Sequence, residues 1–172
     1  MSLTRRFAAR SQIETAIKLF VRHSDPVSAH VLAWSSVEML RGVAKAKGKF
    51  TFHEQLEDWI KPEGLKLWRD RLKTHYNFAK HGDRDPDRIV EDFNPEFTGS
   101  ILFAACHDYN LLYCQRNWLM VVFQSWYFCR NPKFAKEPLI GALPAIAENM
   151  GNPEVRPFSS STLETVEIME NG

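Results

Sequence analysis

The chain has 172 residues, of which 44% are hydrophobic and 25% charged, a composition that excludes a disordered chain and suffices for one domain with its own core. Three cysteines without CxxC spacing exclude a disulfide framework, and no run approaches the ~20 apolar residues of a membrane-spanning helix. The first residues form no apolar signal segment, so we expect a cytoplasmic protein with reduced thiols.

The net charge of +1 hides an uneven distribution along the chain. Residues up to Gly82 include fifteen Lys or Arg and eight Asp or Glu, whereas the remainder includes seven and thirteen. The basic first part is suited to phosphate-bearing partners, and the acidic second part is suited to shielding or docking on that surface. Mutual attraction within one domain is the alternative explanation.

Two long helices are predicted first. In residues 4–23 apolar side chains such as Ile13, Ile17 and Phe20 recur with helical spacing, which indicates one buried face. Asp25 is a suitable N-cap and Pro26 a suitable first residue for the next helix, which is predicted to end near position 47. More than half of the circumference of this second helix is apolar, so we expect it to be central in a bundle.

Two further helices are predicted in the middle of the chain. The sequence from Thr51 to Glu54 matches a capping box and predicts a short helix to about position 60. The next helix is predicted over 63–81, ended by Gly82 and followed by an acidic loop. Its apolar stripe is predicted to contain Leu65, Trp68, Leu72, His75 and Ala79.

Aromatic-rich helices are predicted over 98–114 and 117–129, and one more short helix over 143–150. The predicted fold is an all-α, up-down bundle of five to six helices. Residues 1–150 are expected to form a single domain, and 151–172 an irregular acidic tail.

Most of the functional information lies in one segment, which reads Tyr-Asn-Phe-Ala-Lys-His-Gly from position 76 to 82 and continues into the acidic loop. It resembles the end of the motif helix in HEPN-type helical domains, whose signature is an Arg, four to six residues, and then a His. In those domains the residue after the Arg is commonly Asn. Asn77 and His81 match this pattern, whereas Tyr76 stands where the family places its Arg. The resemblance extends over residues 25–126.

In active members the resemblance implies metal-independent RNA cleavage across a dimer cleft, in which the Arg stabilises phosphate charge and the His transfers protons. For this chain it implies a homodimer that binds RNA or a nucleotide, with no metal and no cofactor. Because the Arg is missing, binding is favoured over catalysis. The candidate catalytic residues are His81 and Asn77. The candidate binding residues are Lys80, Tyr76, Asp83, Asp85, Glu38 and Arg69.

The same residues also fit a purely structural interpretation. Asn77 and His81 lie opposite the apolar stripe, and Lys80 lies where a cation interacts favourably with the helix dipole. For Glu38 the favoured interpretation is an ion pair with Arg41, three residues later. The alternative is a carboxylate that contacts Lys80 or His81 from a neighbouring helix.

Two other patterns remain open as alternatives. Arg69 and His75 also satisfy the loose Arg–His spacing, although His75 falls on the apolar stripe. The alternating Asp residues of the loop 83–92 lack the Gly and Glu that an EF-hand loop requires. A loose magnesium site in this loop is a minor alternative to a solvated acidic surface.

A function of a different class is a non-enzymatic, homodimeric interaction module. The helices over 98–114 and 117–129 supply more aromatic side chains than one small bundle face needs, and an exposed part of them would mark an interface with a protein partner. A basic cleft around His81 would favour RNA binding, whereas an exposed aromatic patch elsewhere would favour the module. The aromatic residues concerned are Trp118, Phe123, Trp126, Tyr127 and Phe128.

Overall fold

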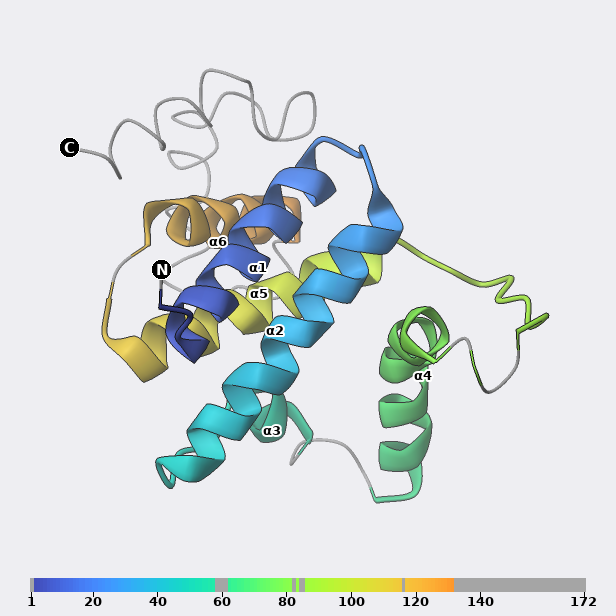
Figure 1. Ribbon diagram of the computed structural model, residues 1–172, viewed down its shortest axis with the longest axis horizontal. Helices are drawn as coiled ribbons and strands as arrows, with labels where there is room; N and C mark the ends of the chain where they lie inside the picture. Colours follow the sequence, from blue (N-terminus) through green and yellow to red (C-terminus); the bar gives the residue numbers. More distant parts are fainter. Residues whose placement is uncertain (1, 58–61, 82, 84–85, 116, 132–172) are drawn as a thin grey trace.

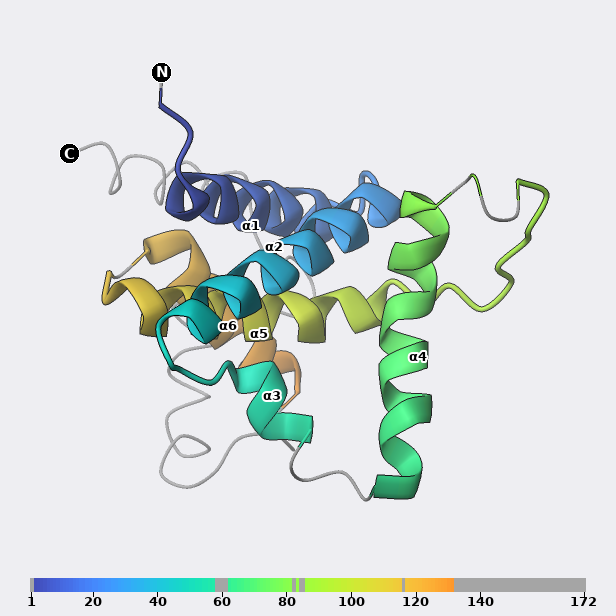
Figure 2. The same ribbon diagram turned by 60° about the horizontal axis from the view of Figure 1, so that its bottom comes forward.

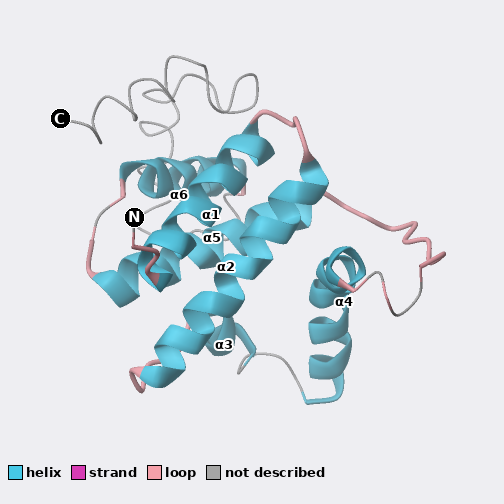
Figure 3. Ribbon diagram, viewed as in Figure 1, coloured by secondary structure: helices cyan, strands magenta, loops and turns pink. Residues whose placement is uncertain are grey.

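The computed structural model describes residues 2–57, 62–81, 83, 86–115 and 117–131, and these ranges contain six helices and no strand (Figure 1, Figure 3). The predicted all-α fold class is therefore confirmed. The predicted helix over 143–150 and the tail 151–172 lie outside the described residues. None of the helices in the described ranges is long and apolar enough to cross a membrane.

Side-chain caps define the starts of the first two helices. α1 (Arg5–Val21) begins after Thr4, whose hydroxyl accepts a hydrogen bond from the Phe7 amide at 3.1 Å. α2 (Pro26–Ala46) begins after Asp25, whose carboxylate accepts from the Ser28 amide at 2.9 Å. Because these caps satisfy amides that the helix leaves unpaired, local sequence is sufficient to place both starts.

The predicted capping box is present at the start of α3 (Phe52–Glu57). The Thr51 amide donates to Glu54 Oε2 at 2.8 Å, and the Glu54 amide donates to Thr51 Oγ1 at 3.2 Å. The Phe52 amide donates to Asp108 Oδ1 at 2.6 Å, which ties α3 to α5 (Glu96–Tyr113). The predicted end of this helix near position 60 lies outside the described residues.

Four helices form the core: α1, α2, α5 and α6 (Trp118–Arg130). α2 contacts α1, α5 and α4 (Pro62–Lys80), so its predicted central position is confirmed. Gly99 permits close packing, because a Cβ atom there would lie 3.2 Å from ring atoms of both Phe20 and Tyr127. The largest fully buried side chains include Ile13, Ile17, Trp34, Leu40, Leu102, Tyr109, Met120 and Phe123.

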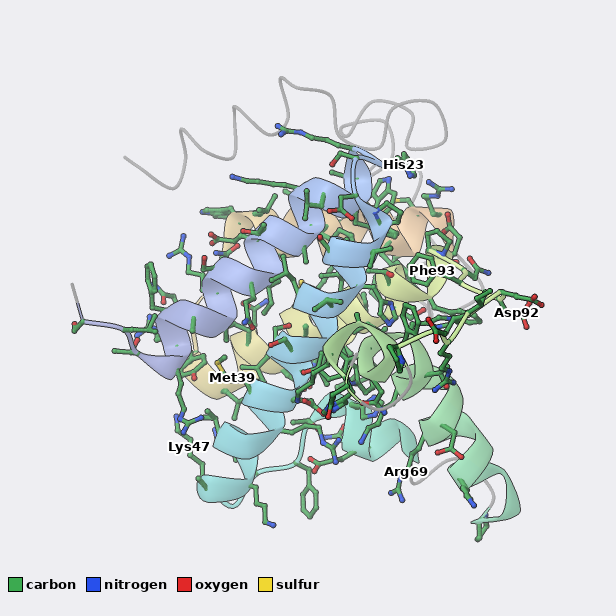
Figure 4. The ribbon with its side chains drawn as sticks, turned by 45° about the vertical axis from the view of Figure 1, so that its right-hand side comes forward. His23, Met39, Lys47, Arg69, Asp92 and Phe93 are labelled. Carbon is green, nitrogen blue, oxygen red and sulfur yellow. The ribbon has the colours of Figure 1, made fainter. Side chains whose placement is uncertain are left out.

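α4 stands at one side of this core and crosses the other long helices steeply (Figure 2). It packs on α2 through residues in its second half, where His75 lies 5.7 Å from the His30 ring, centroid to centroid. Phe93, from the loop between α4 and α5, packs its ring edge-on against both histidines, at 5.6 Å from His30 and 5.1 Å from His75. The adjacent Asp92 points outward into solvent (Figure 4).

His30 is the most deeply buried member of this group, with 2% of its surface exposed. Its Nδ1 lies 3.1 Å from Thr98 Oγ1 on α5, whereas its Nε2 has no hydrogen-bond partner within the described residues. Burial and, to a lesser extent, the nearby His75 lower the pKa of His30 from 6.5 to about 4. His30 is therefore neutral at physiological pH, and the site that holds α4 excludes its charged form.

Acidification is expected to destabilise the fold, because His30 in the unfolded chain titrates near 6.5 whereas folded His30 takes up its proton only at about 4. Between these pH values the unfolded chain binds more protons, so the free energy of unfolding falls with pH by about 3 kcal/mol over the window. The contribution of neutral His30 to the free energy of unfolding is fully present above pH 6.5, the pKa of the unfolded chain, and it is lost as the pH falls to about 4. Urea unfolding at a series of pH values measures this loss.

Two glutamine substitutions separate His30 from the other histidines. His30→Gln retains a polar group near Thr98 without a titrating ring, so it should flatten the pH profile in this window. His23→Gln, at an exposed position, should leave the profile unchanged. If the free energy of unfolding of the His30→Gln protein fell with pH as steeply as that of the unsubstituted protein, His30 would not be the titrating group.

Candidate nucleic-acid interface

Tyr76 is buried at the contact between α4 and α2, with 6% of its surface exposed. Its hydroxyl donates to Glu38 Oε2 at 3.1 Å, and its ring lies 6.3 Å from that of buried Trp34. Burial, followed by the Glu38 charge, raises the pKa of Tyr76. Tyr76 is thus a neutral, inward-pointing side chain, and it does not present a charge to a phosphate.

Lys80 supplies a positive charge one turn further along α4. Its Nζ lies 3.9 Å from Glu38 Oε2 and 5.2 Å from the centroid of the Tyr76 ring. The side chains of Lys80 and Glu38 are 51% and 38% exposed, so this ion pair lies at the surface beside the buried hydroxyl. Three side chains from two helices therefore form one hydrogen-bonded and charged group.

This arrangement corrects the favoured interpretation of Glu38. Glu38 contacts Lys80 and Tyr76 on the neighbouring helix, whereas Arg41 Nε lies 3.8 Å from Glu54 Oε1. The carboxylate is also only partly buried. The interhelical contact prevails because α4 brings both a hydroxyl donor and an ammonium group to the same oxygen.

One exposed face of α4 carries the polar candidates together with two cations that the sequence reasoning missed. Lys66, Arg69 and Asn77 are exposed and Lys73 is partly exposed; Figure 4 labels Arg69 on this helix. These residues and Lys80 follow each other at intervals of three or four, so they lie on one face. The same spacing was available in the sequence. Asp70 is also exposed and lies on the same face, four residues after Lys66 and three before Lys73. We call the group of Lys66, Arg69, Lys73, Asn77 and Lys80 the α4 basic face; with Asp70 included, four cations and one carboxylate give it a net charge of +3.

His81 directly follows α4, and its amide donates to the Asn77 carbonyl at 3.0 Å. Asn77 and His81 are four residues apart, so the two candidate catalytic residues share a face of the helix. Asp83 is exposed beyond them, and Asp85 and Gly82 lie outside the described residues. His81 is partly exposed, a position that a ligand on this face can reach.

The alternative pair, Arg69 and His75, is not brought together. They are six positions apart on the helix, which places their side chains about 120° apart around the axis. His75 points inward to His30 and Phe93, whereas Arg69 is exposed. Ala79, expected on the buried stripe, is also exposed. That expectation was wrong: Ala79 shares a face with His75 and Tyr76, but the buried residue on this face is Tyr76, one turn earlier. The side chains of Leu65, Trp68 and Leu72 lie outside the described residues.

The aromatic side chains of α6 are mostly used inside the bundle. Phe123 and Trp126 are buried, at 0% and 3% exposure, and Phe20 packs edge-on against both. Tyr127 and Phe128 are partly buried and pack on Phe103. Of the five aromatic residues expected at a partner surface, only Trp118 is exposed, at 37%. The prediction that these five aromatic residues form an exposed apolar surface was therefore wrong.

Nowhere in the described ranges do three or more His, Cys, Asp or Glu side chains gather in a group that could hold a metal ion. His107 and Asp108, adjacent on α5, lie 3.6 Å apart, and the His107 ring packs on Phe52. Asp108 itself is fully buried and serves as acceptor for the α3 amide. His107 and Asp108 therefore hold α3 in place through Phe52.

Removing single functional groups should show that Tyr76 fixes α4 and that Lys80 contributes little to stability. Tyr76→Phe removes a buried hydroxyl that donates to a carboxylate, so we expect a loss of about 1 kcal/mol of unfolding free energy. Lys80→Gln removes one partner of an exposed ion pair, and we expect a loss below about 0.5 kcal/mol. Urea unfolding measures both. An equal or larger loss for Lys80→Gln would show that the surface ion pair holds α4.

No protein-family model, curated protein or solved structure matches this chain. The resemblance to HEPN-type domains therefore rests on the segment from Tyr76 to the acidic loop. Function has to be argued from the contacts, charges and exposure of this chain's own residues.

Proposed function

We propose that this chain is a HEPN-like helical protein that binds RNA through the α4 basic face. One observation carries the proposal: four cations and an amide are spaced along one face of a helix that stands at the side of the core. Lysine, arginine and asparagine side chains at such spacing suit successive phosphate and sugar contacts. The excess of positive charge before Gly82 adds a longer-range attraction for a polyanion.

The geometry favours binding over cleavage. In the family that the chain resembles, an Arg at the position of Tyr76 stabilises the phosphate charge. Here Tyr76 points toward Trp34 and Glu38, and the nearest charge, Lys80, is partly neutralised by Glu38. Asn77 and His81, the two residues that match the family's pattern, lie on one face of α4 and can contact RNA there. In this proposal they bind the ribose or phosphate without transferring a proton.

Binding of a labelled single-stranded RNA, measured by fluorescence anisotropy at several salt concentrations, tests this function. Each of Lys66→Gln and Lys73→Gln should weaken binding about fivefold, because each removes one phosphate contact. Each should also reduce the slope of log affinity against log salt by about 0.7. Incubation without metal should leave the RNA intact, both with the unsubstituted protein and with His81→Ala.

Arg22→Gln is the matched control, because it removes an exposed cation just after α1, away from α4. It should change neither the affinity nor the slope. Equal effects of Arg22→Gln and the α4 substitutions would indicate attraction to net charge alone and would overturn the proposed face. Cleavage that is lost in His81→Ala would replace the binding function by a ribonuclease.

A second candidate function, a homodimeric interaction module, is favoured by exposed apolar side chains at the His30 end of the molecule. Val27 lies one turn from His30, Phe78 lies one turn from His75, and Phe97 adjoins Thr98. The three therefore lie near the contacts that His30 makes with His75 on α4 and with Thr98 on α5. Their exposures are 52%, 41% and 55%. Ile89, in the loop after α4, is 80% exposed. A second copy of the chain could cover these side chains.

Sedimentation equilibrium tests this module. If a homodimer forms through this end, Phe97→Ser should raise the dimer dissociation constant by tenfold or more, about 1.4 kcal/mol. Phe50→Ser, which changes a 72% exposed aromatic residue at the other end of α2, should not. A monomeric unsubstituted protein at all concentrations would exclude the module.

A further inference from the structure

The end of the molecule opposite α4 is strongly basic. Figure 2 shows the start of α1, the end of α2 and the end of α5 next to each other at this end. The segments concerned, 2–13, 39–53 and 109–115, contain no Asp or Glu and seven Lys or Arg. The seven are Arg5, Arg6, Arg10, Arg41, Lys45, Lys47 and Lys49.

Most of these cations have no acidic partner. Arg10 pairs with Glu14, and Arg41 lies 3.8 Å from Glu54. Within the part of the chain that the structure describes, the other five form no ion pair with a carboxylate. All five are exposed, so their charges are available to an anionic ligand.

Two of the cations lie against the ring of Tyr113. Arg6 Cζ lies 5.6 Å and Lys47 Nζ 5.1 Å from the ring centroid, and Lys47 Nζ also lies 3.5 Å from the Leu112 carbonyl. Burial and Tyr109 raise the pKa of Tyr113, whereas the charges of Arg6 and Arg5 lower it. Arg5 is adjacent to Arg6 in the chain. We call Arg5, Arg6, Lys47 and Tyr113 the Tyr113 cluster.

Stability alone does not explain the position of these arginines. Arg5 and Arg6 occupy the first turn of α1, which contains no acidic residue. Cations in a first turn are disfavoured by the helix dipole, because the amides there already present a partial positive charge. Two arginines in this turn, joined by a lysine from α2, concentrate positive charge where only an anion would balance it.

Exposed aromatic residues accompany the cations. Phe50, three residues after Lys47, is 72% exposed, and Phe7, next to Arg6, is 44% exposed. Cations interleaved with exposed aromatic rings fit a single strand, whose phosphates pair with the cations and whose unstacked bases stack on the rings. We propose that the Tyr113 cluster and Phe50 form a second contact for single-stranded RNA, so that one strand bridges this end and the α4 basic face. This inference rests on the proposed RNA-binding function.

The two sites are far enough apart for strand length to matter. Lys47 lies nine residues beyond Glu38, the α2 contact of Lys80, which is about 14 Å along the helix axis, and the width of the bundle adds to this separation. A strand of about four nucleotides is too short to bridge both sites, whereas one of about twenty is long enough. A bridging strand gains affinity because its second contact forms at high effective concentration.

The test is fluorescence anisotropy with oligouridine strands of about four and about twenty nucleotides. The unsubstituted protein should bind the long strand at least about tenfold more tightly than the short one. Arg6→Gln combined with Lys47→Gln should remove most of this length advantage and reduce the salt slope by about 1.4, for two phosphate contacts. Phe50→Ser should weaken binding of the long strand with little change in slope. Circular dichroism checks that each variant is folded.

The outcomes distinguish this inference from the proposed function. If Lys66→Gln and Lys73→Gln weaken binding but the Arg6/Lys47 variant and Arg22→Gln bind the long strand normally, the α4 basic face stands and the second contact is overturned. If no RNA binds at all, both fail. Binding to vesicles that contain phosphatidylserine is measured as well. Vesicle binding that the Arg6/Lys47 variant loses, without RNA binding, would assign this end to an anionic membrane surface and overturn the RNA contact.

Discussion

The hydrogen bond from Tyr76 to Glu38 determines how α4 is presented. α4 has a long exposed face and packs on the bundle through α2, so the few contacts at its second half fix its rotation about its own axis. Tyr76 is turned toward Trp34 and Glu38, and Arg69, Lys73 and Lys80 lie seven, three and four residues from it, on the adjoining side of the helix. Lys66, Arg69 and Asn77 are nevertheless exposed, and Lys73 is partly exposed. The His30–His75–Phe93 group provides the second point of attachment, and two points are needed to stop a helix from turning.

The same contact explains why a tyrosine is suited to position 76. A buried guanidinium beside Trp34 would need a full set of acceptors, because a desolvated charge is costly unless it is paired. The tyrosine hydroxyl needs only one acceptor, which Glu38 supplies, and the ring fills the apolar space. The cation is instead provided by Lys80, one turn later, where its ammonium group stays half exposed. The positive charge of this group therefore lies at the solvent-exposed edge of the contact between α4 and α2.

The sequence predicted those features that depend on neighbouring residues. Asp25 and the Thr51–Glu54 box place helix starts because a cap acts over three residues. It failed where the outcome depends on residues distant in sequence. The choice between Arg41 and Lys80 as partner for Glu38 depends on how α4 packs on α2. Ala79 and Tyr76 are three residues apart and share a face, so how far burial extends along this face depends on the same packing. Contacts between segments 38 or more residues apart set that packing. The basic spacing on α4 depends on residues three or four apart and could have been predicted from the sequence.

The distribution of charge links the two proposed contacts. α2 runs between them, with Glu38 near α4 and an acid-free end from Met39 onward. The acidic residues of the loop after α4 lie beyond His81, so they border the α4 basic face at that end. A polyanion is therefore repelled from the loop and attracted along α4 and toward the Tyr113 cluster. An RNA strand that follows this gradient would be guided along one direction of the molecule, and its path would be set by charge before any base is contacted.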